Sequence, residues 1–95
     1  MRGGWVYILT NQPFGVLYIG ITNDLLRRTW EHRQRATECF TKRYYVTRLV
    51  YAEWHEDIRD AIQRETSIKR WPRAWKLDLI TQQNPQWEDR YAQLT

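Results

Sequence analysis

The sequence predicts an α/β fold of the α+β type: a small, three-stranded, mainly antiparallel sheet flanked by three helices, in the order β-β-α-β-α-α. Two observations support this prediction. Three short runs rich in β-branched and aromatic residues are bounded by turn residues, and three longer runs have helical periodicity. The 95 residues are expected to form one domain, residues 1–95, because a second core could hardly form in a chain this short.

The first two strands are predicted to form a hairpin. They cover residues 4–10 (GWVYILT) and 16–22 (VLYIGIT), and the connecting NQPFG combines Asn, Pro and Gly, which is typical of a turn. If Tyr7 faces Tyr18 across the hairpin, both hydroxyl groups lie on the same side of the sheet, whereas a shift of one residue would separate them. Gly20 is expected to end the second strand.

A helix is predicted to follow, from a cap at Asn23 or Asp24 to about residue 35. Its expected apolar stripe consists of Leu25, Leu26, Thr29 and Trp30.

Two pairs of polar residues lie on different sides of this helix. Arg27 and Glu31 fall opposite the stripe, where they are expected to form a solvated pair. Arg28 and His32 lie one turn apart at the edge of the stripe, beside Leu25. Either Arg28 simply extends into solvent and His32 lies where the apolar stripe meets solvent, or the two form one wall of an active site.

The second half of the chain supplies one more strand and two helices. Glu56 and Asp57 place negative charge where a helix is expected to begin, and Pro72 ends that helix and suits the first turn of the next. The remaining elements are an irregular basic and aromatic segment at 36–46, a strand at 47–54, helices at 57–70 and 72–82, and a turn and tail at 84–95.

The helix at 57–70 carries a carboxylate in its apolar stripe. The residues expected to face the core are Ile58, Ala61, Ile62 and Ile68. Glu65 projects from the middle of that stripe, and an ionised carboxylate is costly to bury unless it is paired or binds a metal. Glu65 therefore either forms a salt bridge with Lys69 or binds Mg²⁺ at the base of a cleft. The residues alone leave both alternatives open.

The charge of the chain favours a polyanionic partner such as nucleic acid. The 15 Lys and Arg residues outnumber the 11 Asp and Glu residues, for a net charge of +4 and a pI of about 9.5. FTKRYY (40–45) and IKRWPRAWK (68–76) suit phosphate contact, although a solvated loop explains the first equally well. The basic residues singled out are Lys42, Arg43, Lys69, Arg73 and Lys76.

Other classes of protein are disfavoured by what the sequence lacks. No apolar run approaches the roughly 18–20 residues that a membrane span needs. Cys39 is the only cysteine, which excludes a disulfide framework and a cysteine zinc site and fits a reducing cytoplasm. The sequence has no glycine-rich phosphate loop, no HExxH and no Ser-His-Asp spacing.

Taken together, these residues resemble the GIY-YIG nuclease superfamily, and in particular its small, single-domain bacterial branch. The resemblance covers about residues 5–88. It rests on WVY at 5–7, YIG at 18–20, Arg28, His32 and a helix-borne Glu65, in that order.

The resemblance implies a DNA endonuclease that hydrolyses phosphodiester bonds with a single Mg²⁺ or Mn²⁺ ion. Tyr7 and Tyr18 would line the site, Arg28 matches the family's arginine, and His32 matches the histidine or tyrosine one turn later. Glu65 matches the carboxylate that holds the metal. Either Tyr7 or His32 would then take the proton from water.

The sequence also departs from the family pattern. Its first motif reads Trp-Val-Tyr, and Ile21 stands where several relatives carry a lysine. Asn84 is the candidate for the late asparagine that supports the site in many members, although Asn-Pro is also a common turn. These departures keep two alternatives open: a nucleic-acid-binding module on the same scaffold with little or no catalysis, and an interaction domain in which Glu65 and Arg28 form a buried ion network. A protein partner or a homodimer is expected to supply specificity.

Overall fold

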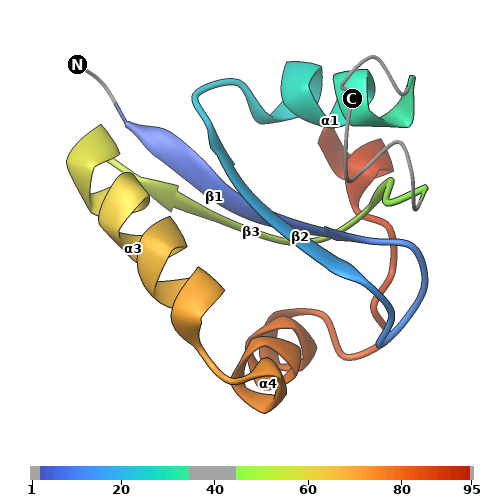
Figure 1. Cartoon of the computed structure of the whole chain (residues 1–95). Coiled ribbons are helices and arrows are strands. Elements are labelled where there is room, and N and C mark those ends of the chain that lie inside the picture. The colour runs from blue at the N-terminus through green and yellow to red at the C-terminus, as the bar shows by residue number, and fades with distance from the viewer. Residues whose placement is uncertain (1–2, 35–44, 95) are drawn as a thin grey trace.

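The structure is a computed structural model, in which residues 3–34 and 45–94 are described (Figure 1). Lys42 and Arg43, two of the residues predicted to contact nucleic acid, lie outside the described residues. Among the described residues, no helix has the length and apolar character needed to cross a membrane.

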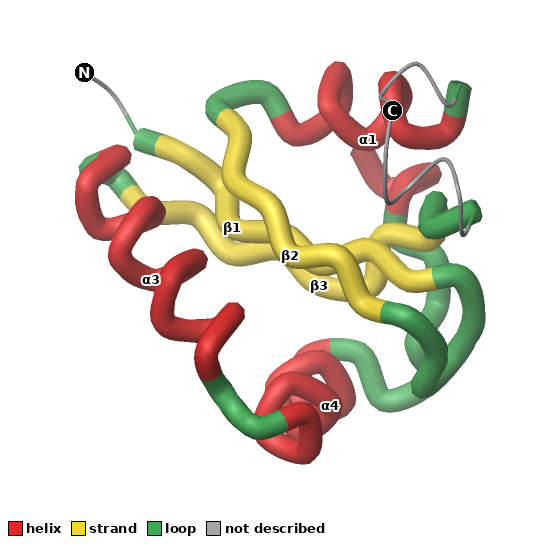
Figure 2. Tube along the Cα trace, viewed as in Figure 1, coloured by secondary structure: helices red, strands yellow, loops and turns green. Residues whose placement is uncertain are grey.

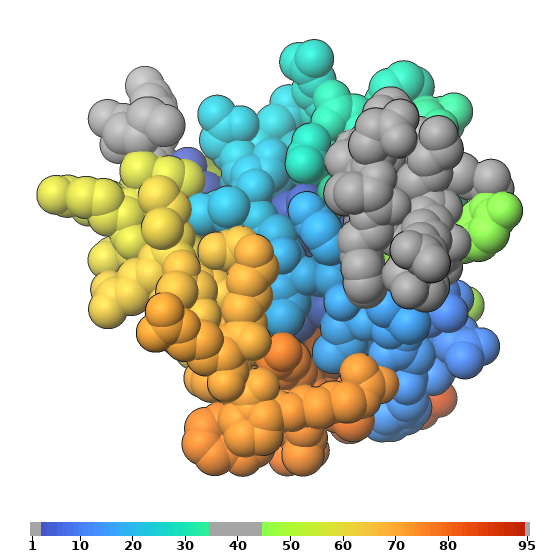
Figure 3. Space-filling view, in the orientation of Figure 1, coloured from blue at the N-terminus to red at the C-terminus, as the bar shows by residue number. Residues whose placement is uncertain are grey.

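Three strands form one antiparallel sheet in the spatial order β2-β1-β3. β1 (Gly4–Thr10) is central, and the edge strands are β2 (Leu17–Thr22) and β3 (Arg48–His55). β1 and β2 are the predicted hairpin, and β3 begins and ends within one residue of the predicted strand. The space-filling view shows β2, in blue, reaching the surface between α1 and α3 (Figure 3).

The helices complete the predicted order and cover both faces of the sheet. They are α1 (Leu25–Arg33), α3 (Ile58–Arg70) and α4 (Arg73–Gln83), followed by a short 3₁₀ helix at Tyr91–Leu94. α1 lies over one face, and α3 and α4 lie over the other (Figures 1 and 2). The predicted α+β fold is confirmed.

Two hydrophobic clusters follow from the alternation of side chains along β1. Val6 and Ile8 point toward α3 and α4, where they pack with buried residues such as Ala61, Ile68 and Ile80. Tyr7 and Leu9 point the other way and pack with Leu25 of α1 and with Val46 and Leu49. Because both faces are covered, the central strand is buried along most of its length.

Asp24, one of the two predicted caps of the first helix, and Asp57, predicted only as negative charge at a helix start, both act as N-caps. The Asp24 carboxylate accepts a hydrogen bond from the Arg27 backbone N–H at 3.1 Å, and Asp57 accepts one from the Arg59 N–H at 2.9 Å. These side chains satisfy backbone donors that have no partner inside the helix. Of the two predicted caps of the first helix, Asp24 is the one used.

The predicted apolar stripes are wrong at three positions. Leu26, Trp30 and Ile62 are all exposed. On α1 the buried line is Leu25, Thr29 and His32, so the helix is rotated toward His32, whose ring finds a polar partner in the sheet. On α3 only a narrow line of residues faces the sheet, with Ala61 and Ile68 buried, and Ile62 falls outside it.

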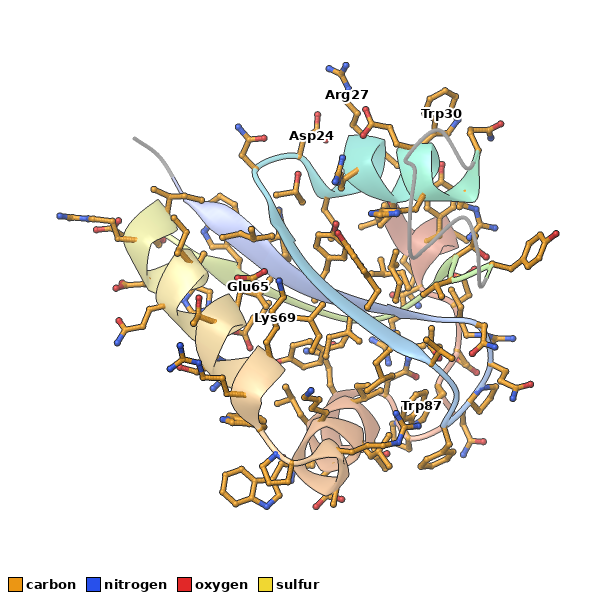
Figure 4. The ribbon with its side chains drawn as sticks, viewed as in Figure 1. Asp24, Arg27, Trp30, Glu65, Lys69 and Trp87 are labelled. Atoms are coloured by element: carbon orange, nitrogen blue, oxygen red, sulfur yellow. The ribbon has the colours of Figure 1, made fainter. Side chains whose placement is uncertain are left out.

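The C-terminal segment protects the edge of β3. The Gln83 side-chain amide donates to the Ala52 carbonyl at 3.2 Å, and the Leu49 N–H donates to Asp89 at 3.1 Å. Trp87 is fully buried and stacks on Phe14, with ring centroids 4.6 Å apart (Figure 4). The predicted turn and tail therefore covers the edge of β3, where it binds backbone groups that pair with no other strand among the described residues.

Candidate functional site

The two motif tyrosines lie on the same face of the hairpin but not opposite one another. Tyr7 pairs with Gly20 across the hairpin, and Tyr18 pairs with Leu9. The assumed pairing of Tyr7 with Tyr18 is therefore wrong by two residues, which preserves the face. The two rings are diagonal neighbours with centroids 6.3 Å apart.

Gly20 makes room for the Tyr7 ring. It lies inside β2, so the expectation that it ends the strand is wrong. A Cβ atom at Gly20 would lie 2.5 Å from Tyr7 Oη, 2.6 Å from Tyr7 Cζ and 3.0 Å from Tyr18 Cε2. The absent side chain lets the phenol of Tyr7 lie across the neighbouring strand, with its hydroxyl beside Tyr18.

His32 completes this group from α1. Its Nε2 lies 3.1 Å from Tyr7 Oη, and its ring centroid lies 5.2 Å from that of Tyr18. His32 and Tyr7 are both fully buried. His32 Nδ1 is also buried and has no hydrogen-bond partner among the described residues. The Tyr7 hydroxyl is thus the polar contact that fixes the imidazole.

Arg28 lies one turn before His32 and keeps about a third of its side chain in solvent. Its guanidinium interacts with the phenol groups of Tyr7 and Tyr18, and the interaction with Tyr7 is the main reason that the pKa of Arg28 is raised. Tyr7, Tyr18, Arg28 and His32 are hereafter called the Tyr–Arg–His cluster. Tyr18 and Arg28 are the members that reach the surface.

Burial sets the protonation of the two interior members of the cluster. It raises the pKa of Tyr7 to about 12, although the neighbouring Arg28 opposes part of this rise. Burial and then the charge of Arg28 lower the pKa of His32 to about 4. At neutral pH the phenol is therefore protonated and the imidazole is neutral, and burial together with the charge of Arg28 makes this imidazole a weaker base than an exposed histidine.

Glu31 contacts the Tyr–Arg–His cluster, although the sequence predicted a pair with Arg27 alone. The Arg27–Glu31 pair is present, with Nε and Oε2 3.3 Å apart. The other carboxylate oxygen of Glu31, however, lies 3.2 Å from Nη1 of Arg28. The spacing of three residues between Arg28 and Glu31 was the available signal. Glu31 holds the guanidinium of Arg28 from its solvent side.

Glu65 approaches from α3, on the other face of the sheet. Its side chain is 15% exposed, and its Oε2 lies 2.7 Å from Lys69 Nζ, which is the salt-bridge alternative predicted from the sequence. Both side chains point from α3 toward the strands (Figure 4). Lys69 and Tyr18 line one hollow of about 280 Å³, together with Leu17, Ile19 and Lys76. Of the predicted site residues, Tyr18, Lys69 and Lys76 line this hollow, and Glu65 is linked to it through its ion pair with Lys69. That Glu65 acts together with the Tyr–Arg–His cluster stays a prediction.

A divalent metal would have one evident protein ligand here. Among the described residues, no group of three or more His, Cys, Asp or Glu side chains is placed to hold a metal ion. Mg²⁺ often takes only one or two carboxylates and fills its remaining positions with water and phosphate oxygens. A partly exposed carboxylate such as Glu65 fits such a site. Lys69, which pairs with Glu65 in this structure, would compete with the metal for that carboxylate.

The other predicted residues have contacts within the fold. Arg73 Nη2 donates to the carbonyl oxygens of Phe14 and Gly15 at 2.9 and 2.7 Å, which fixes the β1–β2 turn. Lys76 Nζ donates to the Lys69 carbonyl at 3.2 Å. Asn84 is buried at the end of α4, and its amide nitrogen donates to the carbonyl oxygens of Val50 and Glu88. These contacts give Asn84 a role in holding the C-terminal segment, and its predicted support of the site stays a prediction.

The fold and the order of these residues define a GIY-YIG catalytic domain, and the chain belongs to this family: residues 3–78 match the family model for the GIY-YIG catalytic domain. Its relatives include UPF0213 protein CPE1444 from Clostridium perfringens, which is 38% identical over 77 residues, covering 81% of this chain and 82% of the relative. A UPF0213 protein from Staphylococcus aureus is 35% identical over 80 residues, covering 84% of this chain and 96% of the relative. The solution NMR structure of UPF0213 protein BH0048 from Bacillus halodurans superposes with a TM-score of 0.58 at 26% identity, covering 92% of each chain.

Proposed function

We propose that this protein is a divalent-metal-dependent endonuclease that hydrolyses phosphodiester bonds in DNA. The observation that carries the proposal is the Tyr–Arg–His cluster, in which an arginine at the surface contacts a tyrosine that is hydrogen-bonded to a neutral, buried histidine. Membership of the GIY-YIG family supports a nuclease. The excess of basic residues supports a nucleic-acid substrate.

Arg28 is positioned to bind the reacting phosphate. Its guanidinium is permanently charged, and its forked donors match two non-bridging phosphate oxygens. Glu31 on one side and the two phenols on the other fix its orientation before substrate binds. A preorganised cation at the point where negative charge develops is usually a large contribution to catalysis.

Tyr7 and His32 form a pair that can accept the proton of the attacking water. At neutral pH the phenol keeps its proton, because its pKa is about 12. It therefore accepts a proton from water only as its own proton passes to His32 Nε2, 3.1 Å away. The transfer leaves an imidazolium at His32 and a neutral Tyr7. Tyr7 is fully buried in the free protein, so the water would reach its hydroxyl only once substrate is bound, and His32, whose pKa is lowered to about 4, would hold the proton only briefly.

Glu65 would hold the metal ion. When bound, the ion would supply a Lewis acid for the phosphate and stabilise the leaving oxygen. Lys69, which pairs with Glu65 and lines the hollow beside Tyr18, is placed to contact a neighbouring phosphate.

A nucleic-acid-binding module with little or no catalysis is the second candidate. It is favoured by the ion pair between Glu65 and Lys69, which satisfies the carboxylate without a metal. It predicts salt-sensitive DNA binding that survives Glu65→Gln.

Plasmid nicking by the purified protein tests the proposal. Supercoiled plasmid is incubated with Mg²⁺, with Mn²⁺ or with EDTA, and the nicked fraction is measured over time. Arg28→Ala is expected to lower the rate by about 100-fold or more, the usual effect of removing one preorganised donor. Arg27→Ala is the matched control, because it removes the same side chain one residue away, where it is 75% exposed. Absence of nicking by the wild type, or equal rates for both variants, would rule out this mechanism, and DNA binding without nicking would favour the second candidate.

A further inference from the structure

A second aromatic surface lies at the junction of α3 and α4, apart from the Tyr–Arg–His cluster. The rings of Trp71 and Trp75 are arranged edge to face, with centroids 5.9 Å apart and planes inclined by 70°. Trp75 is 58% exposed. Burying an indole normally stabilises a small fold, so a large exposed indole face is a feature that binding can explain.

The two indoles form the walls of a hollow of about 270 Å³. It is also lined by Leu79, Asp78 and Gln82, all from α4. Pockets for drug-sized ligands usually start at about 300 Å³, so this hollow suits a single flat ring system. Its lining is aromatic and aliphatic at the walls, and it has two polar side chains one turn apart.

Trp71 is held rigidly from behind. The Arg64 guanidinium lies 5.1 Å from the Trp71 ring centroid, and Arg64 Nε is itself bound to Glu53 Oε2 at 2.9 Å. Trp71 also packs against the core cluster below α3. An aromatic wall whose position is fixed in the free protein binds a ring at a lower entropic cost.

One nearby cation favours a negatively charged nucleic-acid strand at the hollow. Arg70 directly precedes Trp71, whereas Lys69 and Lys76 line the hollow beside Tyr18 and Arg73 is bound to the β1–β2 turn. Arg70 is exposed and makes no ion pair with another described residue. Inside the hollow, the Asp78 carboxylate accepts hydrogen bonds and the Gln82 amide both donates and accepts, which suits the amino-bearing edge of a base.

We propose that the Trp71–Trp75 hollow stacks one unpaired nucleobase of bound DNA, an inference that rests on DNA being the substrate. The base would lie against the exposed indole of Trp75, with Trp71 at its edge and its phosphate toward Arg70. The protein would then prefer DNA in which a base is free to leave the helix. An organic cation would also suit two indoles and a carboxylate, but the charge of Arg64 on Trp71 and that of the neighbouring Arg70 oppose it.

Binding to three labelled duplexes in EDTA tests the inference without cleavage. They share one sequence and differ at one position: fully paired, with an extra unpaired adenine, or with an abasic residue in place of that adenine. Fluorescence anisotropy is expected to show that the wild type binds the adenine duplex at least about fivefold more tightly than the abasic one, the lower end of the range for one base stacked on an aromatic ring. Trp75→Ala should remove this preference, and Trp75→Phe should restore part of it. Trp30→Ala is the matched control, because Trp30 is also about half exposed but lies on α1.

Three results would overturn the inference. The wild type could bind the adenine and abasic duplexes equally, Trp75→Ala could weaken all three duplexes alike, or choline could shift the Trp75 indole NMR signal where deoxyadenosine monophosphate does not. None of these results bears on Arg28-dependent nicking, so the proposed nuclease activity is tested separately. Conversely, an adenine preference in a protein that nicks nothing supports the base site and rejects the nuclease.

Discussion

The glycine of the second motif offers a direct test of how the cluster is built. Gly20→Ala would place a methyl group 2.5 Å from Tyr7 Oη and 2.6 Å from Tyr7 Cζ, well inside van der Waals contact. The neighbouring atoms belong to a stiff, fully buried ring whose hydroxyl is held by His32. The ring or the strand must therefore shift by close to 1 Å to restore ordinary contact distances of about 3.5 Å.

The expected loss of stability follows from two opposing effects. Overpacking a dense site costs about 1–3 kcal/mol. Replacing glycine where its φ is not positive returns about 0.4–1 kcal/mol, because the unfolded chain loses conformational freedom. The net loss should be about 1–2 kcal/mol, which corresponds to a fall in Tm of roughly 4–16 °C for a chain of this size.

Urea unfolding followed by tryptophan fluorescence measures this loss, and plasmid nicking measures whether Tyr7 keeps its place. Nicking should fall by more than the unfolded fraction explains, because the displaced phenol no longer meets Arg28 and His32. The control is Gly20→Ala combined with Tyr7→Leu, where the added methyl group has no ring to displace. Gly20→Ala should then be neutral or stabilising relative to Tyr7→Leu alone. Equal or higher stability of Gly20→Ala in the wild-type background would refute the reasoning.

Three further predictions concern the pH response, the carboxylate and the C-terminal cover. Because the pKa of His32 falls from 6.5 to about 4 on folding, the unfolded state binds more protons between these values. Stability should therefore decrease as pH falls through this window, by up to about 1.4 kcal/mol per pH unit, and His32→Leu should flatten this part of a urea-midpoint profile. Glu65→Gln should change the free energy of unfolding by less than about 1 kcal/mol, because its partner Lys69 is largely exposed. The same variant should abolish metal-dependent nicking. A loss of several kcal/mol in stability would show that the ion pair is structural. Asn84→Ala should lower the free energy of unfolding by about 2–4 kcal/mol, because it leaves buried carbonyl groups unpaired. At a low temperature where the variant stays folded, it should keep the wild-type nicking rate unless Asn84 also supports the site.

The pair of Glu65 and Lys69 links the two candidate functions of this protein. In the free protein, the ammonium group neutralises the carboxylate and prevents an unpaired charge beside β2. A bound metal would offer the carboxylate a stronger partner and leave Lys69 to meet a phosphate. If Glu65 holds a metal as proposed, this ion pair would be exchanged on binding, which would cost little because Lys69 is largely exposed.

Much of the local structure was predictable because its causes are local. The runs of aromatic and β-branched residues gave the strands, Asp24 and Asp57 marked the starts of two helices, and Pro72 separated α3 from α4. Helical spacing also placed Arg28 and His32 on one edge of α1. Each of these outcomes depends on residues within a few positions of one another.

The tertiary structure decided the features that depend on distant residues. The sequence left the hairpin register open, and packing set Tyr7 opposite Gly20, where only a residue without a side chain leaves space for the ring. The rotation of α1 toward His32 depends on a hydroxyl 25 residues away in the chain. The C-terminal segment resembled a tail because its hydrogen bonds are made to β3, more than 30 residues earlier. The sequence by itself thus determined the elements and proposed the chemical groups of the candidate site, whereas the contacts among Tyr7, Tyr18, Arg28 and His32 depend on long-range packing that only the folded chain makes.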